Sequence, residues 1–198
     1  MIITVKAVAF SGCTGLRRIT LSKNTVVEGK YGSAGFPNNI EVHFTGTLAD
    51  WCDEATRIDT LSNSYSLYVM HNNAEKPVTQ IPLQGTELSD IVYIRDHAFQ
   101  NCKSLKEFHH YFAKSITHFG KYAFADAAIT YFDIEGAAFI SGNYTWYKTE
   151  DKAAWKASDV SRAEKVDPTN IALGTPTTDF KEYKKNANYY WFAVKNPE

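Results

Sequence analysis

Residues 98–108, AFQNCKSLKEF, recur at two other places in the chain. Residues 9–19 read AFSGCTGLRRI. Residues 123–132 read AFADAAITYF, with alanine in place of cysteine and one residue fewer before the Leu/Ile position. Further apolar residues lie eight and five positions before each phenylalanine, so at least six apolar positions return in register in every copy. This agreement indicates a true internal repeat, which decides the fold before any single element is assigned.

The spacing of the copies predicts a solenoid. Phe99 and Phe124 are 25 residues apart. A degenerate copy is expected over residues 26–44, because Phe36 follows the first copy at a similar interval and residues 40–44, IEVHF, alternate as a strand does. A period of roughly 20–29 residues with Leu-x-x-Leu-x-Leu character is typical of leucine-rich repeats. Since each turn buries its apolar residues only against its neighbours, we expect a right-handed, mostly β solenoid of about four turns with short helices.

The repeat resembles that of the BspA-type leucine-rich repeat family, whose unit reads roughly I-x-x-I-x-x-x-A-F-x-x-C-x-x-L-x-x-I-x-I-P. Residues 44–51, FTGTLADW, resemble the family's F-x-G-T-x-x-x-W element. Residues 67–69 and 78–82, LYV and VTQIP, resemble its L-Y-I-x-x-x-x-V-T-x-L-x-I-P continuation. The resemblance covers about residues 2–135. It implies a non-catalytic binding or adhesion protein of the kind displayed on bacterial and some protist surfaces or encoded by phages.

Two regions are expected along the chain. Residues 1–136 would form the solenoid, with an inserted segment near residues 45–85 that opens with a short helix carrying Trp51. Residues 137–198 would form a C-terminal cap, made of a helix over about 149–165, a loop, and a strand over about 188–194. Solenoids need such caps to hide the apolar face of the last turn.

The N-terminal end is predicted to lack a cap. The first repeat is in register from Ile2, so almost nothing precedes it. Its end face would be exposed unless a preceding segment, a second copy in a homo-oligomer or a neighbouring chain covers it. Alternatively, residues 1–7 are themselves a sufficient edge.

Composition excludes several classes of protein. Lys and Arg total 21 against 22 for Asp and Glu, a formal net charge of −1, so the positive excess expected of a nucleic-acid binder is absent. No run of 18 apolar residues predicts a membrane span, and no signal-peptide pattern opens the chain. We expect a cell-surface or extracellular location if the chain is part of a longer secreted protein, and otherwise a virion or the cytoplasm.

Catalytic, cofactor and metal motifs are missing from the sequence. It has no H-E-x-x-H, no G-x-S-x-G, no glycine-rich phosphate loop and no C-x-x-C pair. Cys13 and Cys102 share one repeat position that Ala127 takes in the third copy, which predicts a buried packing role for both cysteines. His109 and His110 are adjacent on an expected strand and point to opposite faces. We therefore expect no enzyme and no cofactor.

The remaining candidate is the outer face of the repeat strands, where residues between the buried ones point outward. These residues form an expected ladder of mixed charge with one aromatic: Arg18, Thr20, Glu41, His43, Glu107, His109, Tyr131 and Asp133. We expect it to bind a protein or glycan, although a merely solvated polar face is the competing interpretation. A rival aromatic patch comprises Tyr144, Trp146 and Tyr147, which could equally pack the cap.

Two functions follow. The first is a non-catalytic binding module for cell-surface adhesion or host recognition through this face. The alternative is a structural virion or assembly component that docks a neighbouring chain through the N-terminal face.

Overall fold

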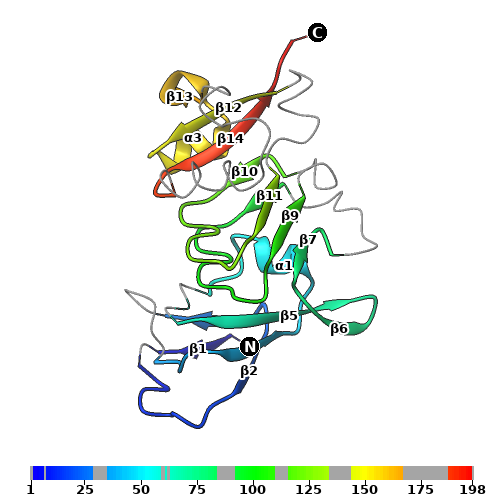
Figure 1. Cartoon of the computed structure of the whole chain (residues 1–198). Helices are drawn as coiled ribbons and strands as arrows, with labels where there is room; N and C mark the ends of the chain where they lie inside the picture. Colours follow the sequence, from blue (N-terminus) through cyan, green and yellow to red (C-terminus); the bar gives the residue numbers. More distant parts are fainter. Residues whose placement is uncertain are drawn as a thin grey trace.

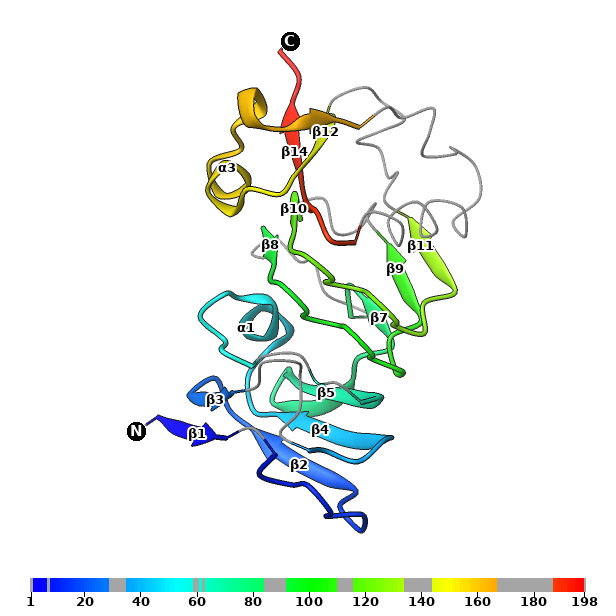
Figure 2. The ribbon, with the colours of Figure 1, turned by 90° about the vertical axis from the view of Figure 1, so that its left-hand side faces the viewer.

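The chain winds into a mostly β solenoid of about four turns with a few short helices, as predicted (Figures 1 and 2). The computed structural model describes residues 2–6, 8–28, 35–58, 61, 63–83, 92–109, 116–133, 144–166 and 187–197. No helix in these ranges is long and apolar enough to cross a membrane.

Two sheets stack along one side of the solenoid, seen towards the right in Figure 2. The first contains β2 (Arg18–Leu21), β4 (Ile40–Phe44), β5 (Tyr65–His71) and β6 (Ala74–Pro77). Its first three strands are parallel, and β6 returns antiparallel to β5. The second is wholly parallel and contains β7 (Gln80–Ile81), β9 (Glu107–His109) and β11 (Tyr131–Asp133).

The opposite side carries shorter strands. It contains the parallel pairs β1 (Ile3–Val5) with β3 (Thr25–Val27), and β8 (Tyr93–Ile94) with β10 (His118–Phe119). The sheet of β10 continues through β14 (Tyr190–Lys195), β12 (Tyr144–Thr149) and β13 (Glu164–Lys165), all antiparallel. The C-terminal strand therefore extends the solenoid sheet directly.

The repeat motif makes the corner between the two sides. His97 and Asn101, two residues before and after Phe99, have φ of 59° and 63°, in the left-handed region. This turns the amides of the corner towards the following turn, where His97 and Phe99 donate to the carbonyls of Lys121 and Ala123 at 2.9 and 2.7 Å. The other two copies have the same left-handed pair, Val8 with Gly12 and Tyr122 with Asp126.

Stacked repeat positions build the core. The rings of Phe99 and Phe124 lie 5.6 Å apart and nearly parallel, and Ala98, Cys102 and Leu105 are fully buried beside them. Turns approach closely at Gly120, where an added Cβ would lie 2.5 Å from the amide nitrogen of Asp96. The equivalent cysteine of the first copy behaves differently: Cys13 is exposed, so its predicted burial is wrong.

Part of the expected inserted segment belongs to the solenoid. It opens with the expected short helix, α1 (Leu48–Cys52), whose N-cap Thr47 forms a capping box with Asp50. Trp51 is buried and donates from Nε1 to the carbonyl of Ala98 at 2.8 Å. The strand β5, however, pairs with β4 in the same parallel sheet. Within the described residues of 45–85, only β6, which returns antiparallel to β5, departs from the parallel stacking of the repeats.

The helix predicted over 149–165 is also too long. Thr149 ends β12, and the helix α3 spans only Lys152–Ala157, with Asp151 as N-cap. It ends because Ser158 takes a left-handed φ of 51°, after which the chain forms the 3-10 helix η1 (Val160–Arg162). The loop expected before the last strand lies mostly outside the described residues, and β14 begins two residues later than predicted.

The C-terminal region packs onto the last turn through aromatic side chains. Trp146 stacks on Phe119 with ring centroids 5.4 Å apart, and Trp155 donates from Nε1 to the carbonyl of Trp191 at 3.0 Å. Tyr122 donates its amide to Ala187 at 2.6 Å, in the place where His97 donates to Lys121. The cap thus supplies the bond that a further turn would have supplied.

Candidate functional site

The first part of the expected ladder lies on β2 and β4. Arg18 pairs in register with Glu41, and Thr20 with His43. Glu41 accepts hydrogen bonds from His43 Nε2 and Arg18 Nε, each at 3.2 Å. These bonds, His43 first, hold the pKa of the Glu41 carboxyl below its usual value. The three side chains form one charged cluster on the outer face of the sheet.

His43 is buried, against the expectation that it is exposed. Tyr68 on β5 stacks on it with ring centroids 4.5 Å apart and 5° between the planes. Glu75 on β6 reaches back to within 2.5 Å of His43 Nδ1. The side chain does point outward, but the β5–β6 hairpin covers it and leaves only 5% of it exposed. His43 is therefore not available to a partner in this conformation.

The second part of the ladder lies on β9 and β11. His109 Nε2 is 2.8 Å from Glu107 Oε2, and Tyr131 stacks on the His109 ring at 4.7 Å. Tyr131 is 36% exposed, and 24% of the His109 side chain is exposed. Asp133 is the backbone partner of His109 in the register. Both clusters reach solvent through their glutamates, but only in the second is the histidine partly exposed as well.

The structure divides the eight ladder residues between two sheets. Arg18, Thr20, Glu41 and His43 belong to the first sheet, whereas Glu107, His109, Tyr131 and Asp133 belong to the second. The expected single continuous ladder is thus wrong. The β5–β6 hairpin interrupts it, because β6 turns back and leaves β7 to start a new parallel sheet.

Both sheets nevertheless carry the same residue types, but in different register: Tyr68 is the strand partner of His43, whereas Tyr131 is the strand partner of Glu107. Each has a Glu-x-His pair on one strand and a tyrosine stacked on the histidine from the next strand of the sheet. We call Glu41, His43 and Tyr68 the first unit, and Glu107, His109 and Tyr131 the second unit. Sequence reasoning missed Tyr68 because it lay in the segment taken as an insertion. The alternation of residues 65–71, YSLYVMH, was the signal that could have placed it on the sheet.

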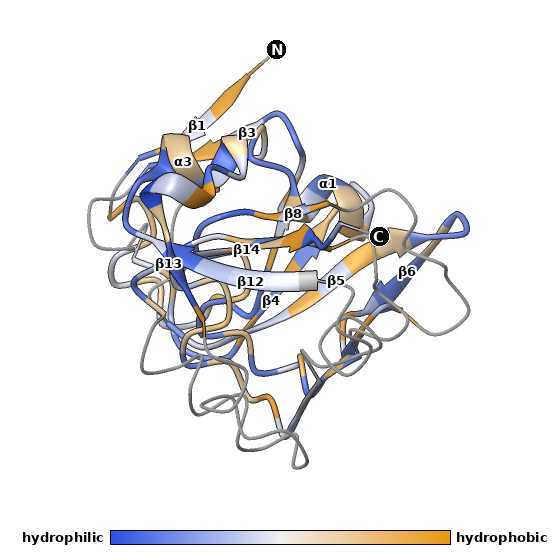
Figure 3. Cartoon of the chain, turned by 90° about the horizontal axis from the view of Figure 1, so that it is seen from above, coloured by the Kyte–Doolittle hydropathy of each residue, from blue (hydrophilic) through white to orange (hydrophobic). Residues whose placement is uncertain are grey.

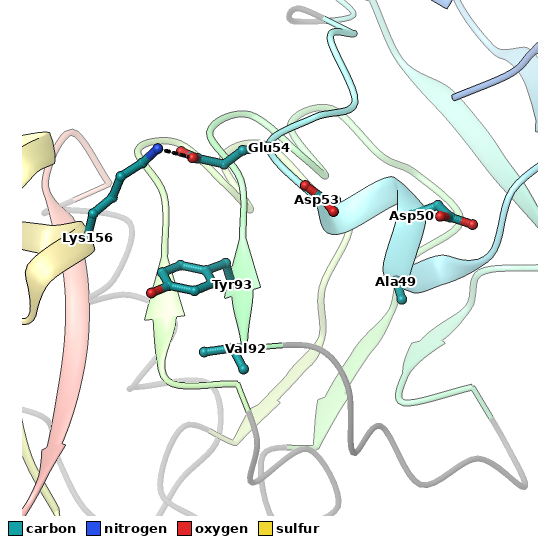
Figure 4. A pocket seen from close by; sticks show the side chains of 7 residues that line it. All are labelled: Ala49, Asp50, Asp53, Glu54, Val92, Tyr93 and Lys156. Carbon is teal, nitrogen blue, oxygen red and sulfur yellow. Dashed lines mark ion pairs between the residues drawn. The ribbon is translucent and has the colours of Figure 1, made fainter. Parts of the chain in front are cut away.

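A cleft of about 620 Å³ opens on the other side of the solenoid, between α1, β8 and α3 (Figure 4). Its carboxylates serve local structure: Asp50 closes the capping box, Asp53 accepts from the amide of Ala55, and Glu54 forms an ion pair with Lys156. Lys152 also pairs with Glu54, at 3.0 Å. These contacts tie α3 to the segment that follows α1, which is a structural role.

The same clamp includes Asp96. Lys152 Nζ lies 3.0 Å from Asp96 Oδ2, and the Tyr190 hydroxyl donates to that oxygen at 3.2 Å. Burial disfavours the charged form of Lys152, but its hydrogen bonds to Glu54 and Asp96 outweigh burial and raise its pKa. The cap is thereby fastened to two successive turns of the solenoid.

Two residues of the rival aromatic patch have structural roles, and Cys52, the last residue of α1, is buried, whereas the side chain of Tyr144 lies outside the described part of the structure. Trp146 is fully buried and Tyr147 stacks on Phe192 at 5.5 Å, so these two residues pack the cap. Burial raises the pKa of the Cys52 thiol to about 12, which is unsuited to nucleophilic chemistry. Across the described ranges, no three His, Cys, Asp or Glu side chains are grouped so as to hold a metal. His110 lies outside the described residues.

Comparison with known families identifies part of the chain. Residues 77–157 match the family described as "BspA type Leucine rich repeat region (6 copies)", which confirms the resemblance over this range. The match includes the second unit but not the first. Repeats of this family are generally non-catalytic and typically form surface binding modules. No curated protein and no solved structure matches the chain significantly.

Proposed function

We propose, taking residues 77–157 as a BspA-type leucine-rich repeat region, that the chain is a non-catalytic binding module acting in cell-surface adhesion or host recognition. The partner is a protein or a glycan, and it binds the outer sheet face around the second unit. The observation that carries this proposal is the exposed Glu107–His109–Tyr131 cluster within the repeat region.

The chemistry of the second unit suits recognition. Tyr131 offers a rigid aromatic surface, and tyrosine is enriched where binding energy concentrates. Glu107 and His109 are polar groups whose mutual contact, at 2.8 Å, holds both side chains in place before a partner arrives. Ordering side chains on binding costs roughly 0.5–1.5 kcal/mol each, so a pre-ordered cluster avoids part of this loss.

The test starts from an array of immobilised glycans and an array of purified secreted proteins. Each hit is then measured with the double variant Glu107→Lys, His109→Glu. We expect the double variant to weaken binding at least about tenfold, because it reverses charge at the centre of the face. The matched control is Glu164→Lys, Lys165→Glu on β13, which makes the same kind of exchange on exposed residues of the cap. Equal binding by the double variant and the control would contradict the proposal, provided both are folded.

A second candidate function, assembly through the N-terminal face, is favoured by the exposure of its apolar residues. Ile2 is 70% and Val8 64% exposed, and Figure 3 shows β1 as an apolar strand at the margin of the molecule. The carbonyls of Ala9 and Ser11 receive no backbone bond from any other described residue, whereas Ala123 and Ala125 at the same repeat positions accept from the preceding turn. The face is therefore built to continue a parallel stack.

Light scattering over a range of concentrations separates the two functions. A stable oligomer that Ile2→Asn with Val8→Asn converts to monomer would support assembly through this face. A protein that is monomeric at all concentrations would rule out homo-oligomeric assembly, and the binding module would then be the favoured function.

A further inference from the structure

We propose that two copies of this chain form a closed, two-fold dimer, in which the exposed strand β1 of each copy packs into the cleft between α1, β8 and α3 of the other. This inference rests on the second candidate function, assembly through the N-terminal face, and names both the partner and the surface that receives it. It is carried by an exposed apolar strand and a partly apolar cleft of opposite charge, which lie on the same side of the molecule.

The first half of the contact is the apolar edge around β1. Ile2 is 70% and Ile3 51% exposed, and Val8 in the same turn is 64% exposed. Among the described strands, β1 pairs only with β3. Single apolar residues scattered over a surface are ordinary, but several in one turn indicate a surface that another element covers.

The second half is the cleft of about 620 Å³ shown in Figure 4. Val92 lines it and is 40% exposed, and Tyr93 and Ala49 line it as well. Protein clefts that hold ligands have volumes of roughly 300–1,000 Å³, so this cleft is large enough to take side chains of a partner. Its apolar wall suits Ile2 and Ile3.

The rim of the cleft still has carboxylate oxygens to offer. Asp50 uses Oδ2 in the capping box, and Asp53 uses Oδ1 to accept from the amide of Ala55. The other oxygen of each carboxylate makes no hydrogen bond with the described residues. A cation brought by a partner would therefore find two acceptors without displacing a contact inside the chain.

The first turn carries the complementary charge. Residues 2–28 contain four basic residues and one acidic residue: Lys6, Arg17, Arg18, Lys23 and Glu28. Lys23 is exposed and forms no ion pair with another described residue. Opposite charges on the two surfaces favour this encounter over the packing of one basic turn against another.

The position of the two surfaces permits a closed dimer. Asp50 and Asp53 also line a second cleft of about 390 Å³, together with Ile2 and Lys23, so the edge around β1 adjoins the first cleft. Figure 2 shows β1, α1 and α3 on one side of the molecule. A two-fold axis between neighbouring surfaces lets each copy fill the cleft of the other, and the assembly then closes at two copies.

The cap excludes the simplest alternative for a second copy. The open first turn lacks a neighbour, but the last turn of another copy cannot stack on it, because β14 and Ala187 already cover that turn. A second copy therefore has to offer a different surface, and the cleft is the one that matches β1 in polarity and charge.

The experiment measures the mass of the full chain by light scattering from micromolar to millimolar concentration. Ile2→Asn and Val92→Asn should each raise the dissociation constant of the dimer at least about tenfold, because each removes an apolar side chain from the contact. The matched control Val160→Asn changes a residue of the cap that is 44% exposed and should leave the constant unchanged. All three residues are exposed in the single chain, so its own free energy of unfolding should change little.

A mixture of the two variants tests the exchange itself. A pair made of one Ile2→Asn copy and one Val92→Asn copy keeps one intact contact, and its other contact carries both substitutions. Since both substitutions remove the same packing, the second costs little once the first is made. We expect the equimolar mixture to dimerise about tenfold more tightly than either variant alone.

The outcomes separate this inference from the functions proposed above. A protein that stays monomeric at millimolar concentration would overturn it and would leave the binding module untouched. A dimer that Ile2→Asn weakens and Val92→Asn does not would preserve assembly through the N-terminal face but refute the cleft as its partner. A mixture that dimerises no better than the separate variants would refute the reciprocal exchange.

Discussion

The two ends of the solenoid carry the same repeat motif in opposite surroundings. In the first turn Phe10 is only half-buried and Cys13 is exposed. In the last turn Phe124 is fully buried and Ala127, the counterpart of Cys13, is 6% exposed. The motif dictates the corner geometry at both ends, since Val8 has the same left-handed φ as its counterparts. Burial, however, depends on what packs against the outer side of the turn, and among the described residues only the C-terminal end has such a cover.

The C-terminal end shows what replaces a missing neighbour. The strand β14 pairs with β10, and Ala187 accepts the amide bond of Tyr122. The cap therefore reproduces both the strand pairing and the corner bond of a further turn. The difference between the ends predicts that equivalent substitutions have unequal effects.

The largest difference is expected for the repeat phenylalanines. Phe124→Ala should lower the free energy of unfolding by about 3–5 kcal/mol, because it opens a cavity in a fully packed core. Phe10→Ala should cost only about 1 kcal/mol, since Phe10 is half-buried and stacks on Phe36 alone among the described rings. Urea denaturation of both variants gives the comparison, and equal losses would contradict the role assigned to the neighbouring turn.

A pH effect is expected at the capped end. His118 lies under the cap, with Nε2 3.1 Å from the Ser158 hydroxyl, and burial lowers its pKa from 6.5 to about 4. Between these two values the unfolded chain binds the proton and the folded chain does not, so stability falls as pH falls. We expect a loss of about 1–2 kcal/mol from pH 7.5 to pH 5, measured by urea denaturation.

The control for this prediction is His118→Phe, which keeps an aromatic ring among Tyr93, Trp155 and Phe192 but cannot be protonated. Its stability should change less over the same pH interval. A wild-type pH dependence that persists unchanged in this variant would assign the effect to other groups.

The two equivalent cysteines give a smaller contrast. Cys102→Ser should cost about 1 kcal/mol, because it places a hydroxyl in a fully buried position. Cys13→Ser should have almost no effect, since Cys13 is exposed. Thermal denaturation measures both, and maleimide labelling of the native protein should modify Cys13 and spare Cys102.

The smallest effect is expected at the open edge. Ile2→Asn should change the free energy of unfolding by no more than about 0.5 kcal/mol, because Ile2 is largely exposed. The matched variant Ile116→Asn, at the equivalent buried position, should be severely destabilised. A large effect of Ile2→Asn that grows with protein concentration would instead show that the edge is buried between copies.

Much of the architecture follows from local pattern. The repeat period, the alternation of residues 40–44 and the aromatic C-terminal strand are sequence features, and they place the parallel turns and the region that closes them. Element boundaries were less predictable. The helix expected over 149–165 ends at Ala157, because Ser158 adopts a left-handed conformation that no local periodicity announces.

The candidate site likewise has features that the sequence predicted and contacts that it did not. The sequence predicted strands at Glu41, His43, Glu107 and His109, and these residues lie on β4 and β9. It did not show that Glu75 and Tyr68 close over His43. These contacts depend on the order of the strands in the sheet, since β6 must lie beyond β5 for Glu75 to reach His43.

The sequence alone determined the length of the turn and the pattern of apolar positions that can face the core, both of which are local consequences of spacing and residue type. Only the tertiary structure decided which turns have neighbours. It buried His43 and left His109 partly exposed, and it covered Phe124 while leaving its counterpart Phe10 only partly buried. The physical reason is that a repeat specifies its own contacts, whereas exposure is settled by whatever packs beside it.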